Sequence, residues 1–202
     1  MNGRFPRRTD GVTARRRRRS PLLAVVAAIS LAALVALNPA GAATATTTVA
    51  IAADAYVAQN QPSRNFGGDT RLKVSSSPLL RTYLRFSIQG LSGTVVSVTL
   101  RVNSISSSSV PVSVFGVADT SWGEQTITYN NAPQPAASAT SSSGSFASKQ
   151  WVSFDVTPLI VGNGLVSFAL ATTSTTAISF NSREAGSATA PQLVITTTSA
   201  RL

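Results

Sequence analysis

The sequence of 202 residues contains no cysteine and no histidine. Without cysteine, the chain can form no disulfide, no thiol nucleophile and no lipid attachment through an N-terminal cysteine. Without histidine, it can form neither a Ser-His-Asp triad nor an ordinary zinc site. Together these absences exclude most classes of enzyme, so we predict no catalytic residue and no cofactor, and we assign no residue to a metal site.

Acidic residues are scarce as well, because 7 aspartates and glutamates stand against 17 lysines and arginines, a formal net charge of +10. The imbalance belongs to the start of the chain, where residues 1–42 contain eight of the arginines and one aspartate. Residues 43–202 therefore hold nine basic and six acidic side chains, a net charge of +3. This small surplus, without a long platform of basic and aromatic residues, argues against nucleic acid as a partner.

The first 42 residues have the three parts of a secretion signal. A basic region ending in the run 15–19 precedes an apolar stretch over 22–37, and Ala40-Gly41-Ala42 supplies the small residues that a signal peptidase reads. The apolar stretch is shorter than the roughly 20 residues that a bilayer span needs. We therefore predict a cleaved signal peptide over 1–42 and a secreted product without a membrane attachment. The alternative is an uncleaved membrane anchor.

After a small-residue linker predicted over 43–48, apolar side chains recur at every second position, which is the pattern of half-buried strands. The clearest runs are 84–88, 96–102, 152–156 and 166–170, and turn-forming residues separate them. Alternation favours antiparallel strands with one face exposed to water. We predict one all-β domain over 49–202, an antiparallel two-sheet jelly-roll sandwich of about nine to ten strands.

Several motifs resemble, in order along the chain, those of DNRLRE domains. The most specific runs from Trp122 through Gly123-Glu124-Gln125 to Ala132-Pro133. The other pieces are Asp54-Ala55-Tyr56-Val57, Asn65-Phe66-Gly67, Leu72-Lys73-Val74, Tyr83-Leu84-Arg85-Phe86, Trp151-Val152-Ser153-Phe154-Asp155-Val156-Thr157, Phe180-Asn181-Ser182-Arg183-Glu184 and Pro191-Gln192-Leu193.

The resemblance implies a β-jelly-roll and an extracellular setting. Domains that look like this accompany polysaccharide enzymes, including alginate lyases and archaeal disaggregatase-like proteins. One group is classed as carbohydrate-binding modules, in which basic residues are proposed to hold acidic glycans. The chain departs from that setting because no catalytic domain is predicted in it.

A basic and aromatic strip is the predicted binding surface. Strand alternation turns Arg71 and Lys73 outward from one predicted strand. The same alternation turns Arg81, Tyr83 and Arg85 outward from the next strand, and the short connection predicts that the two strands pair as a hairpin. Arginine forks suit carboxylates, and a tyrosine ring can stack on a sugar. These five residues are the predicted carbohydrate-binding site for an acidic polysaccharide, with uronates first; the alternative is an ordinary solvated strand surface.

Three acids lie near aromatic residues and are the candidates for a glycosidase or lyase, namely Asp119, Glu124 and Asp155. A glycosidase needs two carboxyl groups facing one cleft. We interpret the three as structural, and we expect Asp155 to bond backbone amides at the turn near Thr157. Asp54 or Asp155 could hold calcium with backbone carbonyls, but a lone aspartate is poor evidence for a metal site.

We expect different environments for the two tryptophans. Trp122 lies among turn-forming residues and is expected to pack, whereas Trp151 has outward parity and leaves sugar stacking open. We therefore predict a secreted, non-catalytic carbohydrate-binding protein. A structural or adhesive surface protein without glycan binding is the alternative, and a lyase or hydrolase is a third possibility.

Overall fold

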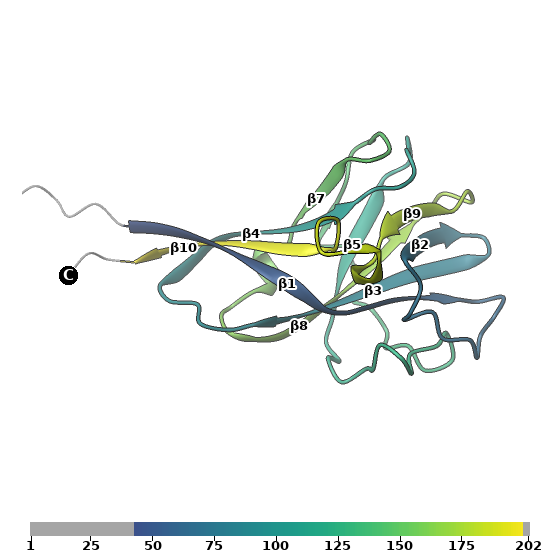
Figure 1. Ribbon diagram of the computed structural model, residues 1–202, viewed down its shortest axis with the longest axis horizontal. Coiled ribbons are helices and arrows are strands. Elements are labelled where there is room, and N and C mark those ends of the chain that lie inside the picture. The colour runs from purple at the N-terminus through teal and green to yellow at the C-terminus, as the bar shows by residue number, and fades with distance from the viewer. Residues whose placement is uncertain (1–42, 200–202) are drawn as a thin grey trace, which may run out of the picture. The chain divides into compact units, whose positions relative to one another are not determined.

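The computed structural model describes residues 43–199, and these residues form an all-β domain (Figure 1). Within this range, no helix is long and apolar enough to span a membrane. The predicted signal peptide lies outside the described residues. The elements are β1 (Ala43–Ala58), β2 (Arg71–Ser76), β3 (Leu79–Ile88), β4 (Thr94–Asn103), β5 (Val112–Val117), β6 (Ser141–Ser142), β7 (Trp151–Asp155), the 3-10 turn η1 (Thr157–Leu159), β8 (Gly164–Thr172), β9 (Ile178–Asn181), the 3-10 turn η2 (Arg183–Ala185) and β10 (Gln192–Ser199).

The strands form two layers that share β1. The first half of β1 pairs with β10, which continues to β4 and β7, while its second half pairs with β3, which continues to β8, β5 and β6. A register shift between Ile51 and Ala53 marks the passage of β1 from one layer to the other. All pairings are antiparallel, which confirms the predicted jelly-roll sandwich.

The strands β2 and β9 extend the layer that contains β4. Over Arg71 to Val74, β2 pairs with β9, and only its last two residues pair with β3. A bridge between Ser104 and Phe180 then joins β9 to the end of β4. The outer faces of β7, β4, β9 and β2 consequently belong to one continuous surface.

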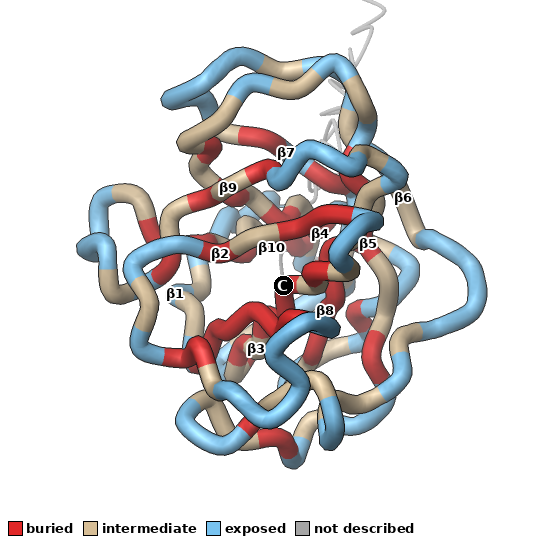
Figure 2. The backbone as a smooth tube through the Cα atoms, turned by 90° about the vertical axis from the view of Figure 1, so that its right-hand side faces the viewer, coloured by how far each residue is buried: buried red, intermediate tan, exposed pale blue. Residues whose placement is uncertain are grey.

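Alternating apolar side chains from both layers fill the interior. Leu84 and Phe86 of β3 and Phe168 of β8 are fully buried, as are Leu100 of β4 and Phe180 of β9. Figure 2 shows the buried stretches along the strands, with the exposed stretches mainly in the loops. Each such side chain contributes about 1.5–3 kcal/mol through burial, so the sandwich rests on this shared core.

Two local expectations differ from the structure. The residues predicted as a linker, 43–48, form the first part of β1 and pair with β10; their small side chains are exposed on both faces, so no apolar alternation marked them as a strand. Val96, which the alternation assigned to the core, is 53% exposed. The register of β4 with β10 shifts between Ser97 and Val95, and such a bulge reverses which face a side chain occupies.

The segment 118–137 covers the outer face of the layer that contains β3. Trp122 and Ile127 of this segment pack on Ala55, Tyr83 and Ala169 in a second buried cluster. The indole Nε1 of Trp122 donates a hydrogen bond of 3.1 Å to Ser167 Oγ. Trp122 therefore packs in the fold, as the sequence predicted.

Candidate functional site

The structure divides the predicted binding strip into two parts. Arg71 and Lys73 lie on β2 beside β9, and the predicted hairpin with β3 exists only at Ser75 and Ser76. The other three residues lie on β3, on the face that segment 118–137 covers. The five residues therefore do not form one strip, and the expectation that they would is wrong.

Tyr83 points to the predicted face of β3, but its side chain is not exposed to solvent. Its side chain is fully buried, and its hydroxyl donates a hydrogen bond of 2.8 Å to the Pro133 carbonyl. Its ring meets that of Trp122 edge-on, with centroids 6.1 Å apart. Burial raises the pKa of the Tyr83 phenol above its ordinary value. The expectation that Tyr83 stands on the surface is wrong, because alternation faces it away from the main core and a loop then covers it.

Arg85 and Arg81 contact the same covering segment. The Arg85 guanidinium donates to the carbonyls of Thr120, at 3.0 Å, and Trp122, and it lies 5.0 Å from the Trp122 ring centroid. Arg81 donates to the Tyr83 hydroxyl at 3.4 Å and borders a shallow pocket of about 280 Å³. The contacts of Arg85 hold the covering segment against β3, and both arginines keep partial access to solvent.

A row of polar and aromatic side chains crosses the opposite layer on its outer face. Trp151 of β7 pairs with Asn103 of β4, and Asn181 of β9 pairs with Arg71 of β2. The Asn181 side-chain amide donates a hydrogen bond of 2.8 Å to Asn103 Oδ1, which joins the two pairs. With strands about 4.8 Å apart, this row spans about 14 Å. We call Trp151, Asn103, Asn181 and Arg71 the tryptophan row.

Arg101 flanks this row and is held by its tryptophan. The guanidinium carbon lies 4.8 Å from the Trp151 ring centroid, and strand pairing places Arg101 between Ser153 and Gln192. Within residues 43–199, salt bridges involve only Arg183 among the cations, so Arg101 and Arg71 have no acidic partner there. The row thus combines oriented amides with two arginines whose donors are available to an anion.

Lys73 lies next to Arg71 along the same face of β2. Its ammonium is 5.1 Å from the Tyr56 ring centroid and 3.5 Å from the Tyr56 hydroxyl. That hydroxyl donates to Asp69 at 3.2 Å. Lys73 is therefore a third cation near the row, although Tyr56 restrains it.

The sequence identified part of this surface and missed part of it. It predicted outward-facing positions for Arg71, Lys73 and Trp151. It did not identify Arg101, Asn103 or Asn181. Outward parity in the 96–102 run could have identified Arg101. No local sequence pattern predicts that β4 and β9 lie side by side, because Asn103 and Asn181 are 78 residues apart in the chain.

A separate cleft of about 1070 Å³ lies beside the serine-rich residues 106–109. Its walls carry hydroxyl groups and the ring of Phe146, and no charged side chain from residues 43–199 lines it. Phe146 packs on Phe180 with ring centroids 5.9 Å apart. This cleft suits a neutral polar ligand better than an anion. Its lining comprises residues 105–110, 145–148, 150, 174 and 176–178.

Two of the three acids considered for catalysis serve local turns. Asp155 accepts hydrogen bonds from the backbone amide and hydroxyl of Thr157 at 2.9 and 2.6 Å, which confirms the structural interpretation. Asp119 accepts equivalent bonds of 2.7 Å from Ser121. These bonds, led by those from the two hydroxyls, lower the pKa of both carboxyl groups. Glu124 lies elsewhere, with Asp54 and Glu184.

Comparison with known proteins identifies the family. A search of curated proteins found no match. The family model described as carbohydrate-binding module family 96 matches residues 45–197, which is most of the chain and spans every strand from β1 to β10. The chain therefore belongs to carbohydrate-binding module family 96.

Proposed function

We propose that this protein is a secreted, non-catalytic carbohydrate-binding module that recognises an acidic polysaccharide, of uronate type in the first instance. The tryptophan row with Arg101 is the proposed contact surface, and Lys73 lies at its edge. The order of motifs that resembles DNRLRE domains, together with the family match, supports the sugar-binding role. The signal-like residues 1–42 support export.

One observation carries the preference for an acidic glycan, namely the position of Arg101 on Trp151. A guanidinium stacked on an aromatic ring loses little conformational freedom when it binds, so its planar donors are pre-oriented. Arginine pairs with carboxylates through two parallel hydrogen bonds. A uronate carries such a carboxylate on its sugar ring, and Asn103 and Asn181 offer amides to neighbouring hydroxyls.

The alternatives lead to different behaviour. A structural or adhesive surface protein would self-associate or remain on cells without sugar. A lyase or hydrolase would degrade a polysaccharide in a manner that depends on Asp119, Glu124 or Asp155. The turn hydrogen bonds of Asp119 and Asp155 give these two carboxylates a local structural role instead.

The first experiment is affinity electrophoresis of residues 39–202, which belong to one compact unit and omit the eight arginines of the N-terminal segment. The gels contain alginate, pectate or a neutral glucan. We expect retardation by the two acidic polymers and its loss near 1 M salt, where the Debye length falls to about 3 Å. Equal retardation by the neutral glucan would contradict acidic specificity, and none in any gel would favour the structural protein.

A matched pair of variants locates the site. Arg101→Ala removes the oriented guanidinium and should weaken the interaction about tenfold or more, as expected for loss of a charge-assisted hydrogen bond. Arg64→Ala removes the same charge from an exposed arginine in the loop after β1, where Arg64 packs on Phe66 at 4.7 Å. Equal weakening by both variants would indicate a nonspecific charge effect and would contradict the proposed surface.

A further inference from the structure

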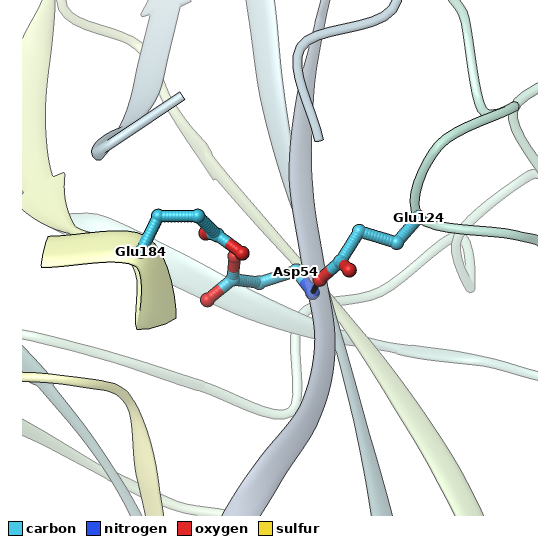
Figure 3. A group of neighbouring side chains, drawn as sticks. All are labelled: Asp54, Glu124 and Glu184. Carbon is cyan, nitrogen blue, oxygen red and sulfur yellow. Dashed lines mark hydrogen bonds between the residues drawn. The ribbon is translucent and has the colours of Figure 1, made fainter. Parts of the chain in front are cut away.

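Three carboxylates from distant segments meet around Asp54 of β1, and in Figure 3 Glu184 and Glu124 approach this strand from opposite sides. Asp54 lies on β1, Glu124 on the covering segment 118–137, and Glu184 on η2. One oxygen from each carboxylate lies within 4.8 Å of the other two. In Figure 3 the Asp54 and Glu184 carboxylates point toward each other from their separate elements.

Some oxygens of the cluster accept hydrogen bonds, whereas two that are buried do not. Asp54 Oδ2 accepts the Arg183 backbone amide at 2.9 Å, and Glu124 Oε1 accepts the Asp54 amide at 2.8 Å. Among the described residues, Asp54 Oδ1 and Glu184 Oε2 are both buried and have no hydrogen-bond partner. The Asp54 residue is only 1% exposed. A buried carboxylate oxygen without a partner is costly, so these two atoms call for a ligand between them.

The charge of the cluster also calls for a cation. The guanidinium Nε of Arg183 lies 3.3 Å from Glu124 Oε1 and 3.0 Å from Glu184 Oε1. One guanidinium against three carboxylates leaves a net charge of −2 when all three are ionised.

We propose that Asp54, Glu124 and Glu184 form a calcium-binding site. The donors are all carboxylate oxygens, which suit a hard cation, and the absence of histidine and cysteine excludes the usual zinc ligands. The three oxygens lie within 4.8 Å of one another, so one ion with ligands about 2.4 Å away can contact all of them. Ca²⁺ accepts flexible coordination by carboxylate oxygens, whereas Mg²⁺ demands a near-ideal octahedron, so we choose Ca²⁺.

Such a site would join three segments that no disulfide connects. Asp54 belongs to the strand shared by both layers, Glu124 to the cover over β3, and Glu184 to the turn that follows Asn181 of the tryptophan row. Calcium would stabilise the attachment of η2 and the cover to β1. This role is independent of the proposed glycan binding, because none of the three carboxylates belongs to the tryptophan row.

The test is a Ca²⁺ titration of residues 39–202 after removal of metals with a chelator. It is done without polysaccharide, because acidic polymers themselves attract Ca²⁺. Calorimetry of the wild-type protein should show binding of one Ca²⁺ ion. The melting temperature should rise by about 8 °C when Ca²⁺ reaches 100 times its dissociation constant. Glu184→Gln, which keeps the size of the side chain, should weaken Ca²⁺ binding at least about tenfold.

Asp119→Asn is the matched control, because it removes one exposed carboxylate outside the cluster and should leave Ca²⁺ binding unchanged. The wild-type titration decides the proposal even if a cluster variant does not fold. No binding at millimolar Ca²⁺ and no change in melting temperature would overturn the proposal. A proton shared by Asp54 and Glu184 would then bridge the two carboxyl groups in place of a metal.

Discussion

Arg101 and Trp151 form a cation–π pair between neighbouring strands, with the guanidinium carbon 4.8 Å from the ring centroid. They are diagonal neighbours, since Trp151 lies opposite Asn103, and Arg101 lies opposite Ser153. The diagonal position lets the guanidinium reach the ring while remaining beside the amides of Asn103 and Gln192. The tryptophan thus orients an arginine that has no acidic partner within residues 43–199.

Because Trp151 orients Arg101, we can predict which of two substitutions weakens glycan binding more. Trp151→Ala leaves the Arg101 charge but frees its side chain, and cation–π contacts contribute about 0.5–2 kcal/mol. We expect a loss of about fivefold in affinity for an acidic polysaccharide, smaller than that of Arg101→Ala, when both are compared by affinity electrophoresis. Trp151→Phe should retain part of the affinity. A larger loss for Trp151→Ala than for Arg101→Ala would mean that the indole itself carries the sugar contact.

Arg85 should matter for stability and not for glycan binding. Arg85→Ala removes hydrogen bonds to the carbonyls of Thr120 and Trp122 and the contact with the Trp122 ring. Loss of a charge-assisted hydrogen bond costs about 1.5–3 kcal/mol, so urea unfolding should show a decrease of about 2 kcal/mol. Arg81→Ala should cost less, because Arg81 makes a single bond of 3.4 Å to Tyr83. Weaker glycan retention at unchanged stability would instead place Arg85 at the sugar.

The main core was predictable because its physical cause is local. In the runs 84–88 and 166–170, alternate residues must face one interior, and the structure buries Leu84, Phe86 and Phe168 as the period requires. The covering segment 118–137 has no such period. Its position over Tyr83 depends on packing between residues that are distant in sequence. Parity therefore predicted the direction of the Tyr83 side chain correctly and its exposure incorrectly.

The candidate site was predictable only in part, for the same reason. Arg71 and Lys73 could be placed on an outer face from β2 alone. Their neighbours could not, because the turn after β2 predicted a long pairing with β3, whereas β2 leaves β3 after two residues and joins β9. The row from Trp151 to Arg71 arises from these long-range pairings.

A pair of adjacent glycines tests how the loop after β1 packs on the covering segment. Asn65 Nδ2 donates to the Glu124 and Ile127 carbonyls at 2.8 and 2.7 Å, which brings Gly67 against this backbone. A Cβ atom on Gly67 would lie 2.7 Å from the Glu124 carbonyl carbon and closer to its oxygen, whereas one on Gly68 would meet nothing within 4 Å.

We therefore expect Gly67→Ala to destabilise the protein by about 3 kcal/mol or more, because the backbone of Glu124 must shift. Gly68→Ala should change the free energy of unfolding by no more than about 1 kcal/mol and could raise it. Chemical denaturation of both variants measures the difference. Similar stabilities would mean that the two loops do not pack as closely as the structure places them.

Asp155 should make the free energy of unfolding decrease at acidic pH. Hydrogen bonds from the hydroxyl and amide of Thr157 hold the pKa of its carboxyl below the ordinary value of 3.8. A lowered pKa means that the unfolded chain takes up this proton first, so the stabilisation is present above pH 4 and is lost as the pH falls through the folded-state value.

Asp155→Asn retains an acceptor oxygen but cannot titrate in this range. The difference in unfolding free energy between wild type and Asp155→Asn should therefore be constant from pH 5 to pH 8. Below about pH 4 the wild type should lose stability relative to the variant. Denaturation at 0.5 M salt, which screens distant charges, measures it, and a difference that stays constant down to pH 2.5 would contradict the role of the Thr157 turn.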